Sequence, residues 1–181
     1  YGGIQAIQTL WAGPWMLNIT GYTPLQSATG LFWINITMLI SYFIWGYILP
    51  KISDYGISSI KLIKLGLPIS YFSLFLIIYF GNNAGAFLFT IYIMTSIVIS
   101  LTQPAIALNF SKNLAGKSLT SFNVFLFSGT FFVQWGIGLV IDLCNNKGFD
   151  ILSSYRISFS IFLFLCVLSY IFFIYLNKNE N

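Results

Sequence analysis

Long apolar stretches alternate with short polar connections from one end of this chain to the other. Segments 72–80 and 161–168 are almost continuously apolar, whereas a membrane-spanning strand would carry polar residues at alternate positions. Each stretch holds roughly the 17 to 25 residues that a helix needs to cross a bilayer. The pattern predicts an all-α membrane protein with one bundle over residues 1–181. The six expected transmembrane helices cover residues 2–20, 27–49, 65–80, 85–108, 119–141 and 157–176.

The composition supports a membrane protein. Hydrophobic residues make up 57% of the 181 residues and charged residues only 7%, whereas a typical soluble domain is about 25% charged. So few charges cannot cover a surface that faces water. The chain is therefore expected to lie in a lipid bilayer.

Basic residues gather on one side of the predicted bundle. The positions after the second, fourth and sixth helices carry Lys51, Lys61, Lys64, Lys112, Lys117 and Lys178. The other connections hold Lys147 and Arg156, which are offset by Asp142 and Asp150. Because lysine-rich connections stay in the cytoplasm, both termini are expected on the cytoplasmic side. Lysines scattered over short connections do not indicate a nucleic-acid partner.

Several kinds of chemistry have no residues to support them. The sequence has no histidine, which is the commonest general base and metal ligand. Its two cysteines, Cys144 and Cys166, show no paired spacing. No phosphate-binding glycine loop and no GxSxG motif occur. We therefore expect no metal site, no cofactor and no enzymatic activity.

The first predicted helix is polar on one side. At about 100° per residue, half of its circumference carries Gln5, Gln8, Thr9, Trp11, Trp15 and Asn18. Polar side chains are costly inside a membrane, so this side either lines a substrate cavity or supplies hydrogen bonds between helices. The two glutamines and two tryptophans favour a cavity, and both interpretations stay open.

Two predicted helices carry a proline near their ends, Pro14 in the first and Pro104 in the fourth. Proline removes a backbone hydrogen bond and kinks a helix. If the six helices form two inverted three-helix repeats, these prolines occupy corresponding places. Interrupted helices at such places point to the binding site of a transporter. The alternative is coincidence, because membrane helices tolerate proline well.

The fifth predicted helix combines small residues with one amide. Gly129, Gly136 and Gly138 favour close helix packing, and Gln134 between them is a further cavity candidate. Glycosylation sequons begin at Asn18, Asn35 and Asn109. All three lie in or beside predicted spans, so we interpret them as chance matches.

Two segments resemble helices of a bacterial group within the major facilitator superfamily. Residues 2–15, which begin GGIQA and end LWAGPW, resemble its seventh helix, and residues 123–142, which contain QWGIG and then ID, resemble its eleventh. The resemblance extends over nearly the whole chain. It implies two six-helix halves, with this chain as the carboxy-terminal half and an amino-terminal half as its partner.

The resemblance also implies a mechanism and a location. A small solute would cross the bacterial inner membrane by alternating access around a central cavity. The implied cavity residues are Gln5, Gln8, Trp11, Trp15 and Gln103. A proton or a sodium ion is the candidate coupling ion. Since no charged residue lies near the middle of a predicted helix, a coupling carboxylate would have to come from the partner half, unless transport is uncoupled.

One departure from the superfamily concerns the loop that gates its cytoplasmic side. Its usual motif, a glycine followed by Asp-Arg-x-Gly, is only partly matched in this sequence. Asp54 and Gly56 are present, but Gly46 is too far away and the arginine is missing. Asp54 and Gly56 are therefore the candidates for the gating loop, which lacks the arginine of the superfamily motif.

The function that we expect is that of a permease half. A self-contained six-helix channel or the membrane domain of an export pump is one alternative, but a channel should show a filter-like repeat or a charged ring, and a pump should show long cytoplasmic helices. A membrane scaffold is another alternative, which would not need a polar side on the first helix. An intramembrane enzyme is disfavoured by the missing histidines.

Overall fold

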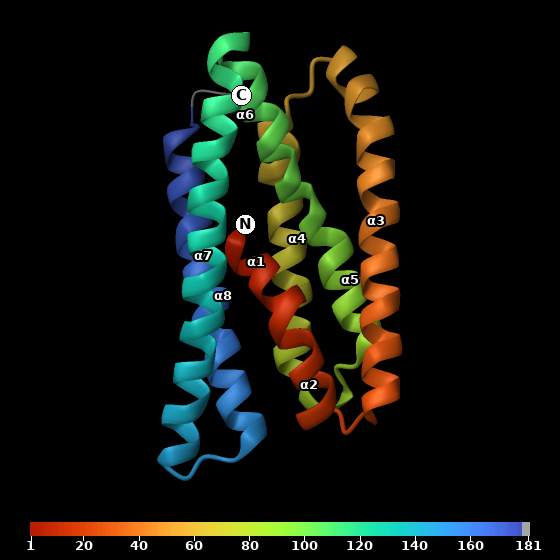
Figure 1. The fold of residues 1–181 in the computed structure, drawn as a ribbon, viewed down its shortest axis with the longest axis vertical. Helices are drawn as coiled ribbons and strands as arrows, with labels where there is room; N and C mark the ends of the chain where they lie inside the picture. Colours follow the sequence, from red (N-terminus) through yellow and green to blue (C-terminus); the bar gives the residue numbers. More distant parts are fainter. Residues whose placement is uncertain (179–181) are drawn as a thin grey trace.

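A computed structural model describes residues 1–178 as a bundle of helices that run up and down alternately (Figure 1). The longer elements are α1 (Gly2–Ala6), α2 (Ala12–Asn18), α3 (Pro24–Asp54), α4 (Ser59–Phe80), α5 (Ala86–Ser96), α6 (Thr102–Asn109), α7 (Lys112–Asn146) and α8 (Ile151–Leu176). A π-helical turn, Ile7–Trp11, joins α1 to α2, and a 3₁₀ turn, Ile97–Leu101, joins α5 to α6. No strand occurs within residues 1–178, so the predicted all-helical class is confirmed.

Five helical stretches within residues 1–178 are long and apolar enough to cross a membrane. They are Pro24–Asp54, Ser59–Asn83, Ala86–Asn109, Lys112–Asn146 and Ile151–Leu176. The first predicted span is a shorter helical segment of α1, the π turn and α2, and it starts part-way along the bundle (Figure 1). The structure therefore supports five spans by length and composition, against the six expected.

Local sequence explains where several helices begin. Thr23 forms a capping box with Gln26, whose backbone N–H lies 3.2 Å from the Thr23 hydroxyl and whose side chain accepts from the Thr23 N–H at 2.9 Å. Asp150 accepts from the Ser153 N–H at 3.0 Å at the start of α8, and this hydrogen bonding lowers the pKa of its carboxyl group. Such caps satisfy N–H groups that have no partner within the helix.

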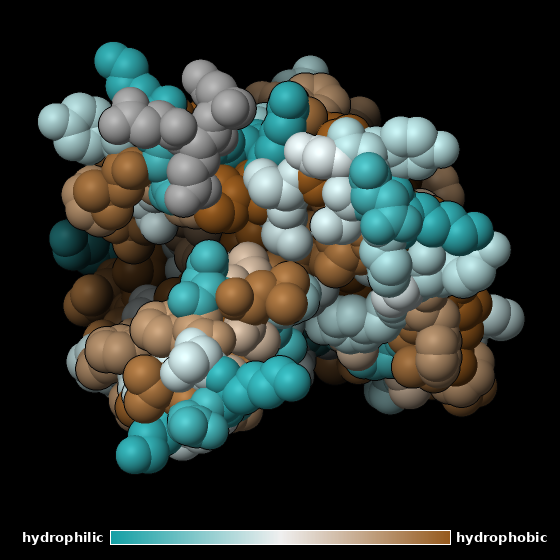
Figure 2. Space-filling model, turned by 90° about the horizontal axis from the view of Figure 1, so that it is seen from above, coloured by the Kyte–Doolittle hydropathy of each residue, from teal (hydrophilic) through white to brown (hydrophobic). Residues whose placement is uncertain are grey.

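The lysine-rich connections meet at one end of the bundle. The α3–α4 and α6–α7 connections and the end of α8 all lie at the top of Figure 1. Seen from above in Figure 2, this end carries groups of hydrophilic residues with apolar side chains between them. The α7–α8 connection, which carries both signs of charge, lies at the opposite end. The charge asymmetry of the sequence is therefore an asymmetry between the two ends of the fold.

The packed centre of the bundle is aromatic. Trp15 of α2 is fully buried, and its ring centroid lies 4.8 Å from that of Phe159 in α8 and 6.1 Å from that of Phe89 in α5. The Trp15 indole N–H donates to the Ala84 carbonyl at 3.1 Å. This cluster holds α2, α5 and α8 together, because burying large aromatic side chains dominates core packing.

Helices α4 and α8 bind each other at both ends. Arg156, in the first turns of α8, donates to the carbonyls of Ile78 and Tyr79 at the end of α4, at 2.9 and 2.8 Å. Lys64, in the first turns of α4, donates to the Asn177 carbonyl after α8 at 2.6 Å. Carbonyls at a helix end have no partner in their own helix and favour a cation. The two helices therefore cap each other reciprocally.

Candidate functional site

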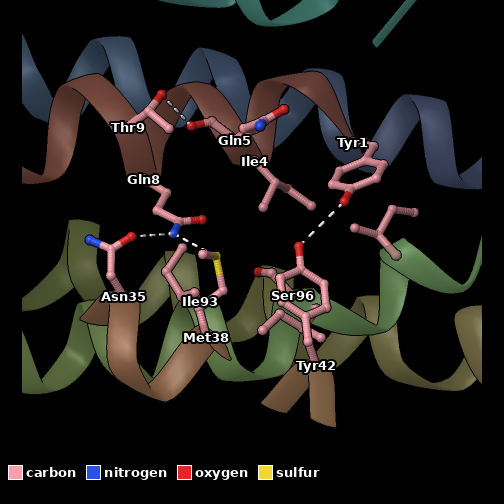
Figure 3. A pocket seen from close by; sticks show the side chains of 12 residues that line it. Tyr1, Ile4, Gln5, Gln8, Thr9, Asn35, Met38, Tyr42, Ile93 and Ser96 are labelled. Atoms are coloured by element: carbon pink, nitrogen blue, oxygen red, sulfur yellow. Dashed lines mark hydrogen bonds between the residues drawn. The ribbon is translucent and has the colours of Figure 1, made fainter. Parts of the chain in front are cut away.

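A polar cavity of about 150 Å³ lies between α1, the π turn, α3 and α5 (Figure 3). Its wall combines amide, hydroxyl and thioether groups with isoleucines, and none of its residues is charged. The lining residues are Tyr1, Ile4, Gln5, Gln8, Thr9, Asn35, Met38, Tyr42, Ile93, Ser96, Ile97 and Ile99. Polar groups inside an apolar bundle are costly, so their concentration here marks the region as a candidate site.

An amide pair joins the two long walls of this cavity. Gln8 Nε2 donates to Asn35 Oδ1 at 3.3 Å and lies 2.8 Å from the Met38 sulfur. Asn35 Nδ2 in turn donates to the Leu31 carbonyl of its own helix at 2.7 Å. These contacts fix the Gln8 side chain of the π turn against α3.

Hydroxyl groups and a second amide complete the polar wall. The hydroxyls of Tyr1 and Tyr42 lie 3.5 Å apart across the cavity. Ser96 of α5 shares a 2.6 Å hydrogen bond with Ser70 of α4 and donates to the Tyr92 carbonyl. The side-chain oxygen of Gln5 is buried and has no hydrogen-bond partner within residues 1–178.

The π turn and the 3₁₀ turn Ile97–Leu101 both border the cavity. Gln8 and Thr9 belong to the π turn, and Ile97 and Ile99 belong to the 3₁₀ turn. The cavity is thus walled on two sides by segments that depart from regular α-helix. Irregular turns of this kind are frequent at functional sites.

Each irregular turn precedes one of the two prolines noted in the sequence. Pro14 has no N–H for the Leu10 carbonyl, and just upstream the Ala12 N–H bonds Ile7, five residues back. Pro104 likewise has no N–H for the Ser100 carbonyl, and the nearby Thr102 hydroxyl donates to the Ile99 carbonyl at 2.6 Å. Neither proline lines the cavity, but the distortion beside each one does.

The structure places Trp11 and Gln134 at the contact between the first helix and α7. The Trp11 indole N–H donates to the Gln134 carbonyl at 3.2 Å, and Gln134 Nε2 donates to the Thr9 hydroxyl at 3.0 Å. Gly138 lies against the Trp11 ring, where an added Cβ would still fit. Both residues thus join two helices, and neither is among the residues that line the polar cavity.

Four other candidates also lie away from this cavity. Trp15 belongs to the buried aromatic cluster, and Gln103 is exposed at the start of α6. Asp54 is the last residue of α3 at the end of the bundle. Gly56 follows in the connection, where its φ of 79° explains a glycine. Of the six predicted cavity residues, the structure brings Gln5 and Gln8 to the polar cavity.

Sequence reasoning missed the contribution of α3. Asn35, Met38 and Tyr42 come from this helix, and Asn35 was set aside as a chance sequon. A signal was present, since an asparagine inside an apolar span needs a partner. The sequence did not reveal that Gln8 is that partner, because the two residues belong to different helices.

A second, larger cavity of about 470 Å³ lies on the other side of α1, toward α7 and α8. Its wall is largely apolar and includes Ile63, Leu67, Phe122, Leu126 and Phe162. Most binding sites combine an apolar wall with a few convergent polar groups. This cavity has the apolar wall but lacks the convergent amides, so the smaller polar cavity is the stronger candidate.

A comparison of this chain with protein-family models, with curated proteins and with solved structures finds no significant match. The resemblance to the major facilitator superfamily stays a prediction. The geometry of the cavity is therefore the structural basis for a function.

Proposed function

We propose that this chain is one six-helix half of a secondary transporter of the major facilitator type, which carries a small solute by alternating access. The observation that carries the proposal is the polar, uncharged cavity between two interrupted helical stretches. Discontinuous helices form the substrate sites of several transporter folds, because their irregular turns free backbone and side-chain groups for binding.

The size of the cavity supports a site that is shared with a second body. Complete sites for small molecules have volumes of about 300–1,000 Å³, whereas this cavity measures about 150 Å³. Thr9 and Asn35 on its wall are exposed. We infer that an amino-terminal six-helix half covers these residues and completes the site.

Two structural features fit a rocking movement. The reciprocal capping between α4 and α8 makes that pair a rigid unit. The helices that border the cavity contain π and 3₁₀ turns, which adjust more readily than regular helix. In this proposal, α4 and α8 form the support against which the cavity helices move.

The proposal has a direct test in reconstituted membranes. The full-length protein is placed in liposomes, and uptake from a pool of small metabolites is measured by mass spectrometry against protein-free liposomes. We expect saturable uptake of a restricted set of solutes. Absence of any uptake would contradict the proposal, and stepwise ion currents in a planar bilayer would favour a channel instead.

A further inference from the structure

The hydrogen bonds at the polar cavity have a fixed direction. A backbone carbonyl accepts hydrogen bonds and cannot donate, so Asn35 must direct its NH₂ group to the Leu31 carbonyl. Its side-chain oxygen then faces Gln8, which must present its own NH₂ group. The oxygen and nitrogen of a side-chain amide are hard to tell apart by shape, and hydrogen bonds decide which is which. Here the Leu31 carbonyl fixes the orientation of the Asn35 amide, and Asn35 in turn fixes that of Gln8.

This direction leaves the Gln8 oxygen unused. The Gln8 nitrogen is engaged by Asn35 and Met38, whereas its oxygen accepts no hydrogen bond from residues 1–178. In Figure 3 that oxygen points away from Asn35, into the space in front of Ile93 and Ser96. The cavity therefore offers an acceptor at a defined position.

The neighbouring hydroxyls are already engaged. Thr9 donates to the Gln5 carbonyl at 2.8 Å and accepts from Gln134. Ser96 bonds with both Ser70 and the Tyr92 carbonyl. The free hydrogen-bonding capacity of Gln8 itself is thus that of an acceptor, which a bound molecule satisfies with an O–H or N–H group.

The part of the cavity wall that residues 1–178 form offers no side-chain counter-charge. None of its lining side chains is charged, and an ion moved from water against such a wall loses hydration without compensation from it. From these two features we propose that the solute is uncharged and donates a hydroxyl or amide hydrogen to the oxygen of Gln8. This inference rests on the proposed transport function, and it names the class of substrate and the residue that selects it.

A matched series of probes tests the charge requirement. Glucose and N-acetylglucosamine are neutral donors, glucosamine is a cation and gluconate is an anion, and all share a similar six-carbon frame. They are added together with neutral, cationic and anionic metabolites of other frames to liposomes that contain the full-length protein. We expect the solutes taken up to be neutral molecules with hydroxyl or amide donors.

Variants of Gln8 test the acceptor. Gln8→Leu removes the oxygen, and we expect uptake of the preferred neutral solute to fall about tenfold, the factor that loss of one hydrogen bond of about 1.4 kcal/mol produces. Gln8→Glu keeps an acceptor but adds a charge, so the ratio of cationic to neutral solute taken up should rise. Asn113→Leu, at the exposed start of α7 and away from the cavity, is the matched control and should leave uptake unchanged.

Asn35→Leu tests the direction of the hydrogen bonds. This change frees the Gln8 amide to rotate while leaving Gln8 itself in place. A positioning role predicts a higher KM for the neutral solute with little change in kcat, whereas a purely structural role would lower the amount of folded protein and leave KM unaltered.

The outcomes separate the two proposals. Uptake restricted to charged solutes, or uptake of neutral solutes that Gln8→Leu leaves unchanged, would overturn the inference while the transport function stands. Absence of uptake by the unaltered protein would overturn the transport function itself. Selective uptake of neutral donors, lost in Gln8→Leu and kept in Asn113→Leu, supports both.

Discussion

The two ends of the first helical segment differ in what surrounds them. Around α1 and the π turn, residues such as Gln8 face a polar cavity and Thr9 is exposed. About two turns later, in α2, Trp15 and Met16 are fully buried. The sequence predicts the polar and aromatic residues of both parts on one side of the helix. Only the first part borders the polar cavity.

The difference follows from the neighbours of each part. The π turn faces α3 and α5 across the cavity, whereas α2 meets Phe89, Tyr155 and Phe159, which close around the Trp15 ring. A tryptophan donates one hydrogen bond and otherwise packs as a large apolar group, so it serves equally well in a cavity wall and in a core. The comparison shows that polarity along one helix does not by itself distinguish binding from packing.

The largest expected effect tests the buried end of the segment. Trp15→Ala should lower the free energy of unfolding by about 3–5 kcal/mol, because it removes a large core side chain and leaves a cavity. Trp15→Phe, which keeps a ring but loses the 3.1 Å bond to Ala84, should cost about 1 kcal/mol. Denaturant unfolding in detergent measures both.

Solute uptake by the same variants tests whether Trp15 acts only in packing. Uptake per folded molecule should stay close to normal in Trp15→Phe. A stable Trp15→Ala protein with strongly reduced uptake would instead assign Trp15 to the binding site, and the contrast between the two ends would fail.

A smaller effect is expected where α1 approaches α7. A Cβ on Gly2 would lie within 2.6 Å of the backbone nitrogen of Thr130 and close to the Leu126 carbonyl, so Gly2→Ala forces two backbones apart. Overpacking of this kind costs about 1–3 kcal/mol. Thermal unfolding of the purified protein measures the loss.

Gly136→Ala is the matched control for this contact. No atom lies within 4 Å of a Cβ built at Gly136, and alanine favours helix over glycine. We expect stability to be unchanged or slightly raised. Equal losses in the two variants would show that the α1–α7 contact is looser than the structure indicates.

The smallest expected effect concerns the bond between Gln134 and Thr9. Their side chains lie 3.0 Å apart, and hydrogen bonds between membrane helices average about 0.6 kcal/mol in double-mutant cycles. A cycle of Thr9→Val, Gln134→Leu and the double variant should give a coupling energy of that size. A coupling near zero would leave the Trp11–Gln134 backbone contact as the main polar link to α7.

Much of the architecture was predictable because lipid imposes it. Stretches of apolar residues must form helices in a bilayer, since their backbone groups have no other partners, and the expected spans from 27 to 176 correspond to long helices in the structure. The helix ends were less predictable. Helix α7 runs from Lys112 to Asn146, beyond the expected 119–141, because polar residues at the membrane border remain helical.

The candidate site was only half predictable. Gln5 and Gln8 were marked by their cost in an apolar span, and Pro14 and Pro104 marked the helices that distort. The contribution of Asn35 depended on which helix faces the π turn, and that is a matter of packing between distant segments. Gln103, which the resemblance implied as a cavity residue, is exposed at the start of α6, and its role in a cavity stays a prediction.

The sequence by itself determined a bundle of helices that are long and apolar enough to cross a membrane, with basic residues at one end, because hydrophobicity and charge act on each segment independently of its neighbours. Only the tertiary structure decided that Trp15 packs in the core and that Gln8 meets Asn35 across a cavity. Those outcomes depend on contacts between residues far apart in the chain. Side chains of similar polarity then differ only in which neighbours the fold brings to them. The direction of the Leu31–Asn35–Gln8 hydrogen bonds, and hence the acceptor that faces the cavity, belongs to this second kind.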